Sequence, residues 1–237
     1  MTVILQNALP VEMLVPHVLP GVAPCGADDW LRVDEAYAAQ MAYRIVLMAD
    51  KPKEVLWLSP DALPAAQEVL HEALGILPPL GFDVQSDHVI CPDDRRVSLD
   101  WDDPLRTMGH LMQQDVCLLE KRGTEHVLTG AVLCFPASWR LADKVERPLS
   151  AIHDPVAEYD ESLGRRVQRM FDGVRAGRPL WRFNRLNYVD ADLYQPVRKA
   201  GGNTGEFTRS ERQCILRLPR SNAVAFTIHT YVVPNIG

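Results

Sequence analysis

Apolar residues in the first half of the chain recur at intervals of three and four positions. Residues 34–48 and 60–77 each place them on one face of a helix, which predicts two amphipathic helices. Ser59 precedes the second segment and is predicted to cap it through its hydroxyl group. Residues 83–103 are polar and rich in turn formers, and they predict a connection. Residues 105–114 predict a third, shorter helix.

From residue 115 onward the period changes to that of extended strands. Residues 115–120 and 126–134 are apolar runs around a glycine-containing loop, and they predict a β-hairpin. Residues 181–189 predict a further strand. Apolar and polar residues alternate most regularly near the C-terminus, where residues 207–218 and 222–233 predict an antiparallel pair.

One helix interrupts the predicted strands, because residues 159–175 carry apolar side chains on one face and arginines on the other. The other predicted helices come before the strands in the chain, and only this one lies between strands. Such an order favours an α+β fold over a doubly wound parallel sheet. Residues 1–27 are apolar but interrupted by prolines, so we expect an arm laid over the body. We therefore expect an arm, residues 1–29, and a single domain, residues 30–237.

Composition and charge narrow the possible functions. The net charge of −6 argues against nucleic acid or an anionic membrane as a partner of the whole molecule. The five cysteines include no C-x-x-C pair, which predicts neither a disulfide framework nor a zinc knuckle. The N-terminus has no basic leader, and no apolar run approaches the length of a membrane span. We expect a soluble protein in a reducing cytoplasm.

Several catalytic and cofactor signatures are absent. The chain has no G-x-G-x-x-G after a strand, no G-x-x-x-x-G-K-[ST], no G-x-S-x-G and no C-x-x-C-H. The last absence excludes covalent attachment of haem. Non-covalent haem stays open, because it requires only an axial ligand, an apolar slot and donors for the propionates.

His153 is the strongest ligand candidate in the sequence. It lies between Pro148 and Pro155, in the stretch 135–160 that joins a predicted strand to a predicted helix. Proline fixes its own φ and restricts the residue before it, so a histidine here has little backbone freedom. Such a histidine suits a metal or haem ligand. A capping or core histidine would give the same pattern.

Two predicted strands carry polar residues at every second position. Arg182 and Asn184 share one side of the first strand, while Arg209, Glu211 and Gln213 share one side of the second. The two sets would line a common polar pocket if the strands were neighbours. A solvated sheet face with surface ion pairs would have the same sequence.

Two other histidines are weaker candidates. His229 lies on the less apolar side of the last predicted strand, where it would hydrogen-bond a ligand in a cavity, although a half-exposed sheet face also accommodates a histidine without function. His110 lies in the third predicted helix without a second histidine at ligand spacing, and we expect a partly exposed helical residue.

An ordered set of motifs resembles the haem-dependent oxidative N-demethylase family, of the α-subunit type. The resemblance covers residues 30–234 and includes a lysine at Lys144. The other motifs are F-P-x-S-W at 135–139, I-H-x-P-V at 152–156, R-x-N at 182–184, and R-S-E-R-Q through L-P-R-S to F-T-I-x-T-Y at 209–231. The ordered set is more specific than any single motif in it.

The resemblance implies a PAS-like α+β fold, with N-terminal helices before an antiparallel sheet and a crossing helix. It implies a monooxygenase-type enzyme that binds haem b without a covalent bond and removes a methyl group from a small secondary amine with dioxygen. Formaldehyde would be released. Electrons would come from a reductase partner that draws on a nicotinamide cofactor through a flavin or iron–sulfur centre.

The resemblance and the residue chemistry together suggest site roles. His153 is our choice for the axial iron ligand. Glu211 and Arg212 are expected in the distal pocket, where a carboxylate relays protons and a guanidinium stabilises reduced oxygen or holds a propionate. Three further residues are expected to contact the cofactor or substrate: Arg182, Asn184 and His229.

Two positions depart from the family pattern as we expect it. Arg185 replaces a tryptophan after Asn184, and Ala157 replaces a proline after Val156. A changed pocket would mean a different substrate or a haem protein without demethylase activity. A haem-binding PAS-type sensor and a haem-free structural subunit are therefore the competing hypotheses.

Overall fold

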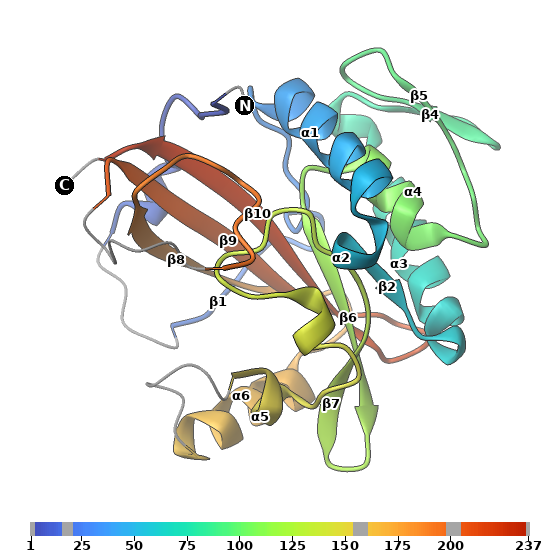
Figure 1. The fold of residues 1–237 in the computed structure, drawn as a ribbon. Coiled ribbons are helices and arrows are strands. Elements are labelled where there is room, and N and C mark those ends of the chain that lie inside the picture. The colour runs from blue at the N-terminus through green and yellow to red at the C-terminus, as the bar shows by residue number, and fades with distance from the viewer. Residues whose placement is uncertain (1–2, 16–20, 154–160, 198–204, 236–237) are drawn as a thin grey trace.

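The computed structural model describes residues 3–15, 21–153, 161–197 and 205–235, and Figure 1 shows how their elements are arranged. Mixed helices and antiparallel strands confirm the α+β prediction. None of the helices in these ranges combines the length and apolarity that crossing a bilayer requires. The helices are α1 (Tyr37–Asp50), α2 (Pro52–Val55), α3 (Leu63–Ile76), α4 (Pro104–Leu111), α5 (Leu149–His153) and α6 (Glu161–Gly173).

Seven of the described strands form an antiparallel sheet in the order β1-β8-β9-β10-β6-β7-β2. The last strand in the chain, β10, is central and joins the β6–β7 hairpin to the β8–β9 pair. The strands are β1 (Ala23–Pro24), β2 (Leu56–Leu58), β6 (Asp115–Arg122), β7 (Glu125–Val132), β8 (Leu180–Tyr188), β9 (Phe207–Arg217) and β10 (Val224–Pro234).

Most of the predicted elements are confirmed. Helices α1, α4 and α6 match their apolar periodicity, and the segment 60–77 divides into a short 3-10 turn, η2 (Pro60–Ala62), followed by α3. The prediction that Ser59 caps this helix through its hydroxyl is wrong. The hydroxyl instead donates to the carboxylate of Asp61, two residues further on, and makes no hydrogen bond with the N–H groups of the first turn.

A small separate sheet occupies the region predicted as a connection. Its three short strands pair in the order β3-β4-β5: β3 (Asp83–Val84), β4 (His88–Ile90) and β5 (Arg96–Ser98). Strands of two or three residues are too short to produce a periodic pattern, so the prediction missed them.

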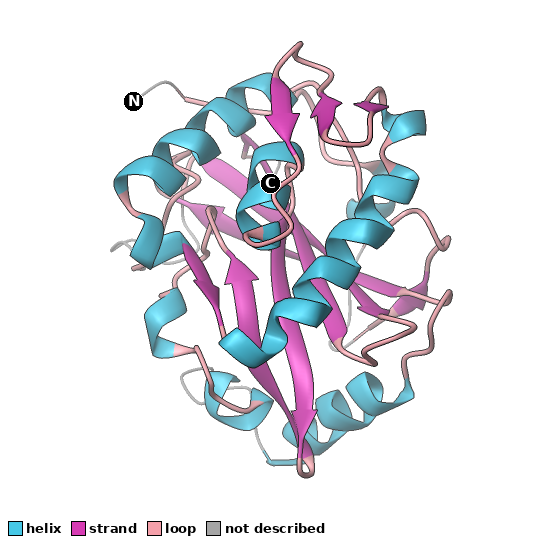
Figure 2. Ribbon diagram, turned by 90° about the vertical axis from the view of Figure 1, so that its right-hand side faces the viewer, coloured by secondary structure: helices cyan, strands magenta, loops and turns pink. Residues whose placement is uncertain are grey.

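The two faces of the large sheet carry different cores. Helices α1, α3 and α4 pack on one face, here called the α1 face, and α5 and α6 pack on the other, the α6 face. Cys214 and Leu216 point to the α1 face, and Ile215 points to the α6 face. Figure 1 shows the two groups of helices apart, and Figure 2 shows the first group in front of the strands.

The N-terminal arm docks on the α1 face next to α1, where Gln6 and Gln40 both donate to the Thr230 carbonyl. The backbone N–H of Gln6 donates to the Val232 carbonyl (2.9 Å), and its side-chain oxygen accepts from the Val232 N–H (2.8 Å). Met13 is fully buried in a cluster with Phe183. The arm also contributes β1, a short strand that was not predicted and that pairs with the edge of β8.

A buried ion pair joins the helices to the sheet. Arg44 of α1 and Asp115 at the start of β6 are both fully buried, with 2.6 Å between Nη1 and Oδ1. The rest of the guanidinium donates to backbone carbonyls, so the buried charge is satisfied. Those carbonyls belong to Gly109, Gln113 and Gln114.

The carboxylate of Asp115 also holds the end of the hairpin. Its oxygens accept from the backbone N–H groups of Cys134 (2.7 Å) and Phe135 (2.8 Å), just after β7. The Arg44 guanidinium also lies 5.3 Å from the centre of the Phe135 ring. One carboxylate thus determines where the chain leaves β7 and enters the stretch that leads to His153.

Close packing of α4 depends on Gly109. A Cβ atom at this position would lie 2.5 Å from the Met48 sulfur of α1 and 2.9 Å from a Val132 methyl group of β7. Neither contact is possible without movement, because the interior is close-packed. The missing side chain lets α1, α4 and β7 meet.

We predict that Asp115→Ala lowers the free energy of unfolding by about 3–5 kcal/mol, because Arg44 is left buried without a counter-charge. Urea unfolding followed by circular dichroism measures this loss. Lys121→Ala is the matched control, since it breaks a surface ion pair with Asp172 and should cost no more than about 1 kcal/mol. Equal losses in the two variants would contradict the prediction.

Candidate functional site

A ladder of polar residues crosses the α6 face of the sheet. Arg182 pairs with Gln213 and Asn184 with Glu211 in the β8–β9 register, and Thr230 of β10 pairs with Glu211 from the other side. The structure therefore brings together the two polar sets, for which the sequence had left open a common polar pocket or a solvated sheet face. We call this the polar ladder, and its members are Arg182, Asn184, Arg209, Glu211, Gln213 and Thr230.

The polar ladder adjoins the apolar core beneath α6. One rung beyond Gln213, Ile215 and Leu180 are paired and belong to that core. Along β8 and β9, the side chains on the α6 face thus change from apolar to polar. This is a suitable combination for a ligand with an apolar body and charged or polar ends.

Glu211 is the centre of the polar ladder and is 5% exposed. Its Oε2 accepts from Asn184 Nδ2 (2.9 Å) and Gln213 Nε2 (3.1 Å), while the Glu211 N–H donates to Asn184 Oδ1 (3.0 Å). Arg209 Nη2 lies 3.5 Å from Oε1. The carboxylate is therefore held by donors on three sides.

Three buried polar atoms of the polar ladder have no hydrogen-bond partner among the described residues. They are the Nε atoms of Arg182 and Arg209 and the hydroxyl oxygen of Thr230. Burial lowers the pKa of Arg182, against the opposing effect of the nearby Glu211 carboxylate. A buried donor without an acceptor is costly, so these atoms favour an acceptor that arrives with a ligand.

Arg209 connects the polar ladder to the rest of the fold. Its Nη2 donates to the Phe135 carbonyl (2.6 Å) and its Nη1 to the Leu193 carbonyl (2.9 Å). The sequence indicated Arg209 as a polar strand residue but assigned no role to it. Thr230 was missed, although its spacing of two from Ile228 places it on the same face.

The segment around His153 is anchored to β7. Pro148 bridges to Val127, and the short helix α5 begins at the next residue and ends at His153. Lys144 is 7% exposed, and its ammonium group donates a hydrogen bond to the Ile152 carbonyl. This hydrogen bond fixes the C-terminal end of α5. The side chain of His153 and the whole of Ala157 lie outside the described residues.

Arg212 lies on the opposite side of the sheet from Glu211, because neighbouring residues on a strand point to opposite faces. Its guanidinium donates to Asp29 Oδ2 (2.8 Å) and to Cys214 Sγ (2.9 Å), and it covers the Trp181 ring. The structure therefore does not bring Glu211 and Arg212 into one pocket.

The two other positions singled out in the sequence also lie off the polar ladder. His229 is buried on the α1 face, where Nε2 lies 2.9 Å from Asp34 Oδ2 and Nδ1 lies 2.6 Å from Gln114 Nε2. Both ring nitrogens are thus used within the fold. Arg185 follows Asn184 but is exposed and points away from Glu211.

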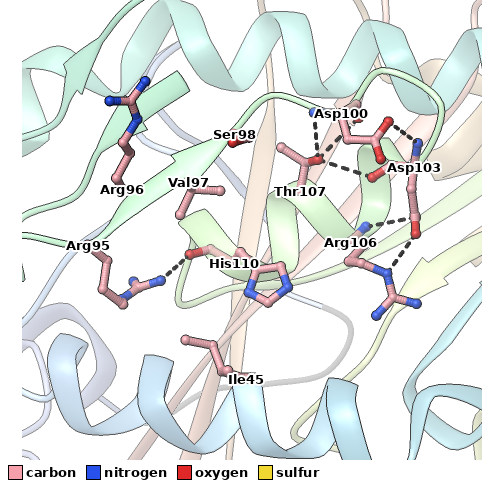
Figure 3. A pocket seen from close by; sticks show the side chains of 10 residues that line it. All are labelled: Ile45, Arg95, Arg96, Val97, Ser98, Asp100, Asp103, Arg106, Thr107 and His110. Atoms are coloured by element: carbon pink, nitrogen blue, oxygen red, sulfur yellow. Dashed lines mark hydrogen bonds and ion pairs between the residues drawn. The ribbon is translucent and has the colours of Figure 1, made fainter. Parts of the chain in front are cut away.

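A cavity of about 420 Å³ lies on the α1 side of the molecule, between α1, β5 and α4 (Figure 3). Arg95 donates to the His110 carbonyl (2.8 Å), and Arg106 donates to Asp103 (2.7 Å). Burial, with the nearby Arg106 and Arg95, lowers the pKa of His110. His110 is half-buried in α4, which confirms its prediction as a partly exposed helical residue. Most of the charge in this cavity is already paired.

Over the described part of the chain, no group of three or more His, Cys, Asp or Glu side chains is arranged to hold a metal ion. Comparison with known families gives a match over residues 21–235. The matching family is described as haem-dependent oxidative N-demethylase, alpha subunit-like. The matched range contains the whole polar ladder, Lys144 and His153.

We predict a loss of stability in acid through Asp34. Burial opposes its ionisation, but hydrogen bonds from His229, Gln113 and Gln6 outweigh this and lower its pKa to about 2. An aspartate in the unfolded chain has a pKa of about 3.9. The free energy that ionised Asp34 contributes to stability is therefore complete above that pH and is lost as the pH falls through about 2.

The comparison variant is Asp34→Asn, which cannot titrate. Between about pH 4 and pH 2, the wild type should lose roughly 2 kcal/mol more unfolding free energy than the variant does. Urea unfolding at a series of pH values measures this difference. Parallel pH profiles for the two proteins would show that Asp34 does not carry the effect.

Proposed function

Because the chain belongs to the haem-dependent oxidative N-demethylase, alpha subunit-like family, we propose that it binds haem b non-covalently at the polar ladder. We propose further that it oxidises the N-methyl group of a small secondary amine. The proposed site lies on the α6 face, where the apolar core under α6 meets the polar ladder. The apolar part suits a porphyrin and the polar part suits its carboxylates.

The unpartnered donors of the polar ladder carry this proposal. Arg182 Nε, Arg209 Nε and the Thr230 hydroxyl are buried on one sheet face, and the described residues offer them no acceptor. A haem propionate would supply acceptor oxygens and negative charge to these groups. The residues present therefore fit an acidic cofactor, with Arg182 and Arg209 as the expected propionate ligands and Asn184 beside them.

His153 is the proposed protein ligand of the haem iron. The porphyrin would itself supply nitrogen ligands to the iron, so one histidine from the protein would be sufficient to hold it. Lys144 supports this assignment, since its buried ammonium group fixes the carbonyl next to His153 and thereby the end of α5. When bound, haem would supply the redox chemistry with dioxygen that the substrate requires.

The proposed reaction balances as a monooxygenation. A secondary methylamine, dioxygen, two electrons and two protons give the primary amine, formaldehyde and water. Glu211 is the proposed proton carrier at its Oε atoms, because it is the buried carboxylate of the polar ladder. Asn184, Gln213 and Arg209 orient it. Arg212 lies on the opposite face of the sheet, so its proposed role is indirect: it would hold β9 against the arm.

We also propose that residues 30–237 form one PAS-like haem domain and that residues 1–29 form its arm. The antiparallel order β7-β6-β10-β9-β8 supports this, as do α5 and α6, which cross between β7 and β8. The family is named for an alpha subunit, which supports a partner subunit. In our proposal the partner is a reductase that passes electrons from a nicotinamide cofactor through a flavin or iron–sulfur centre.

We predict that the purified protein, reconstituted with haem, has a Soret absorption band and that His153→Ala weakens or shifts it. The reason is the loss of the axial nitrogen. His71→Ala is the control, because His71 is exposed on α3 and far in sequence from the motifs. Absorption spectroscopy with haem titration is the measurement. A colourless wild type after reconstitution would exclude the proposal and favour a haem-free subunit.

We predict that Glu211→Gln retains the Soret band but lowers formaldehyde release from dimethylamine by about 100-fold, because a proton carrier is lost. Formaldehyde is assayed with a reductase system and a nicotinamide cofactor. Glu206→Gln is the control, since Glu206 is an exposed carboxylate just before β9. A wild type that binds haem but releases no formaldehyde would favour the sensor, for which Arg185 is the sequence argument.

A further inference from the structure

The outer side of α6 and the turn that follows it carry arginines that the proposed function does not use. Arg166 and Arg169 are exposed on the helix, and Arg175 and Arg178 are exposed in the turn that leads to β8. We call these four residues the arginine surface. None of them forms an ion pair with a described carboxylate. Because the whole chain has a net charge of −6, this positive surface is a local feature.

A carboxylate on the same helix is engaged elsewhere. Asp172 Oδ1 lies 2.5 Å from Lys121 Nζ of β6, and this hydrogen-bonded ion pair lowers the pKa of Asp172. Asp172 therefore does not neutralise Arg169, which lies three residues earlier. Arg166 lies a further three residues back, and exposed like charges at this spacing on a helix repel one another. The positive charge of α6 is thus left for a partner outside the described chain.

Other contacts attach α6 to the sheet without using the arginine surface. Gln168 Oε1 accepts from the His126 N–H of β7 (3.1 Å), and Gln168 Nε2 lies 2.8 Å from His126 Nδ1. At the C-terminal end, Arg217 of β9 donates to the carbonyls of Phe171 and Val174. Arg217 therefore already satisfies the carbonyls that a cation at a helix C-terminus contacts. The arginine surface is not needed for this purpose.

The arginine surface lies over the apolar part of the proposed haem site. The inner side of α6 supplies Phe171 and Val174 to the core that also contains Ile215 and Leu180, next to the polar ladder. Figure 1 shows α5 and α6 on the outside of the molecule, apart from α1, α3 and α4. A helix with its side chains is about 10–12 Å across. A protein bound to the outer side of α6 would therefore be about one helix diameter from this core.

We propose that the arginine surface is the docking surface of the electron donor, and that this donor is a protein with an acidic surface. The inference rests on the proposed function, which requires electrons to enter a site on the α6 face. Opposite charges speed the encounter of two proteins and orient them. Arginine suits such an interface, because its guanidinium binds a carboxylate through two parallel hydrogen bonds. Two one-electron transfers from the reduced donor would supply the two electrons of the monooxygenation.

Two other classes of partner also bind arginine-rich helices, namely anionic membranes and nucleic acids. A helix that lies in a membrane surface exposes apolar side chains beside its basic ones, and a single nucleic acid strand stacks on aromatic rings. Among the described side chains of α6 and its following turn, no large apolar residue is exposed. The net charge of −6 also opposes the approach of a polyanion to the whole molecule. A protein with a local acidic surface therefore fits best.

The first test measures binding to the haem-free full chain by calorimetry, with an acidic plant-type ferredoxin as the probe. Binding should weaken at least roughly tenfold when the ionic strength rises from about 0.02 M to about 0.3 M. The double variant Arg166→Glu, Arg169→Glu should weaken it by about the same factor at low ionic strength. The control is Lys53→Glu with Arg96→Glu, because it reverses as many exposed charges, on α2 and β5. It should bind like the wild type, and circular dichroism checks that both variants fold.

The second test measures electron transfer in the haem-loaded protein under anaerobic conditions. The second-order rate of haem reduction by reduced ferredoxin, followed by absorption, should fall at least roughly tenfold in the double variant Arg166→Glu, Arg169→Glu. Dithionite is a small reductant that needs no docking surface. It should reduce the wild type and the double variant at the same rate, which shows that the haem site is unchanged.

Equal binding of ferredoxin by the wild type and the double variant, or no binding by either, would overturn the docking proposal. Binding of RNA or of phosphatidylserine vesicles by the wild type, lost in the double variant, would also overturn it. A protein without a Soret band would instead exclude the proposed haem function, while the calorimetric test on the haem-free chain would still decide whether the arginine surface binds an acidic protein. The two failures are therefore distinguishable.

Discussion

The rest of the structure depends on the buried ion pair between Arg44 and Asp115. Neither side chain is exposed, and each is satisfied by further hydrogen bonds to backbone atoms. Such a pair contributes less net stability than its geometry suggests, because both ions lose their hydration. The pair instead fixes the relative positions of four segments. They are α1, the end of α4, the start of β6 and the end of β7, which must all meet at this carboxylate and guanidinium.

This constraint extends across the sheet to the candidate site through Phe135. Its N–H donates to Asp115, and its carbonyl accepts from Arg209, which lies beside Glu211. The helical layer and the polar ladder therefore share one residue of the backbone. A site that holds a large rigid cofactor benefits from such support, because its ligands must keep their relative positions when the cofactor binds.

Strand β9 serves both faces of the sheet with adjacent residues. Glu211 belongs to the proposed haem site, while Arg212 fastens the arm through Asp29 and contacts Cys214. The alternation of a strand makes this division unavoidable. The arm therefore contacts the site through the backbone of its strands, at β9 and also at β10, where Gln6 donates to the Thr230 carbonyl, and at β8, which pairs with β1. The arm is thus part of the support of the site, although it contributes no side chain to the polar ladder.

The sequence by itself determined the local elements, since apolar periodicity predicted α1, α3, α4, α6 and the five long strands. It also predicted that Arg182 and Asn184 share one side of their strand and that Glu211 and Gln213 share one side of theirs, because a period of two requires it. Tertiary structure alone decided the central place of β10, the small sheet, the acceptor of Ser59 and the ion pair of Arg212 with Asp29. The physical reason is the sequence separation of the interacting residues. Periodicity is local and shows which side of an element is buried, whereas strand neighbours and side-chain partners depend on segments far apart in the chain.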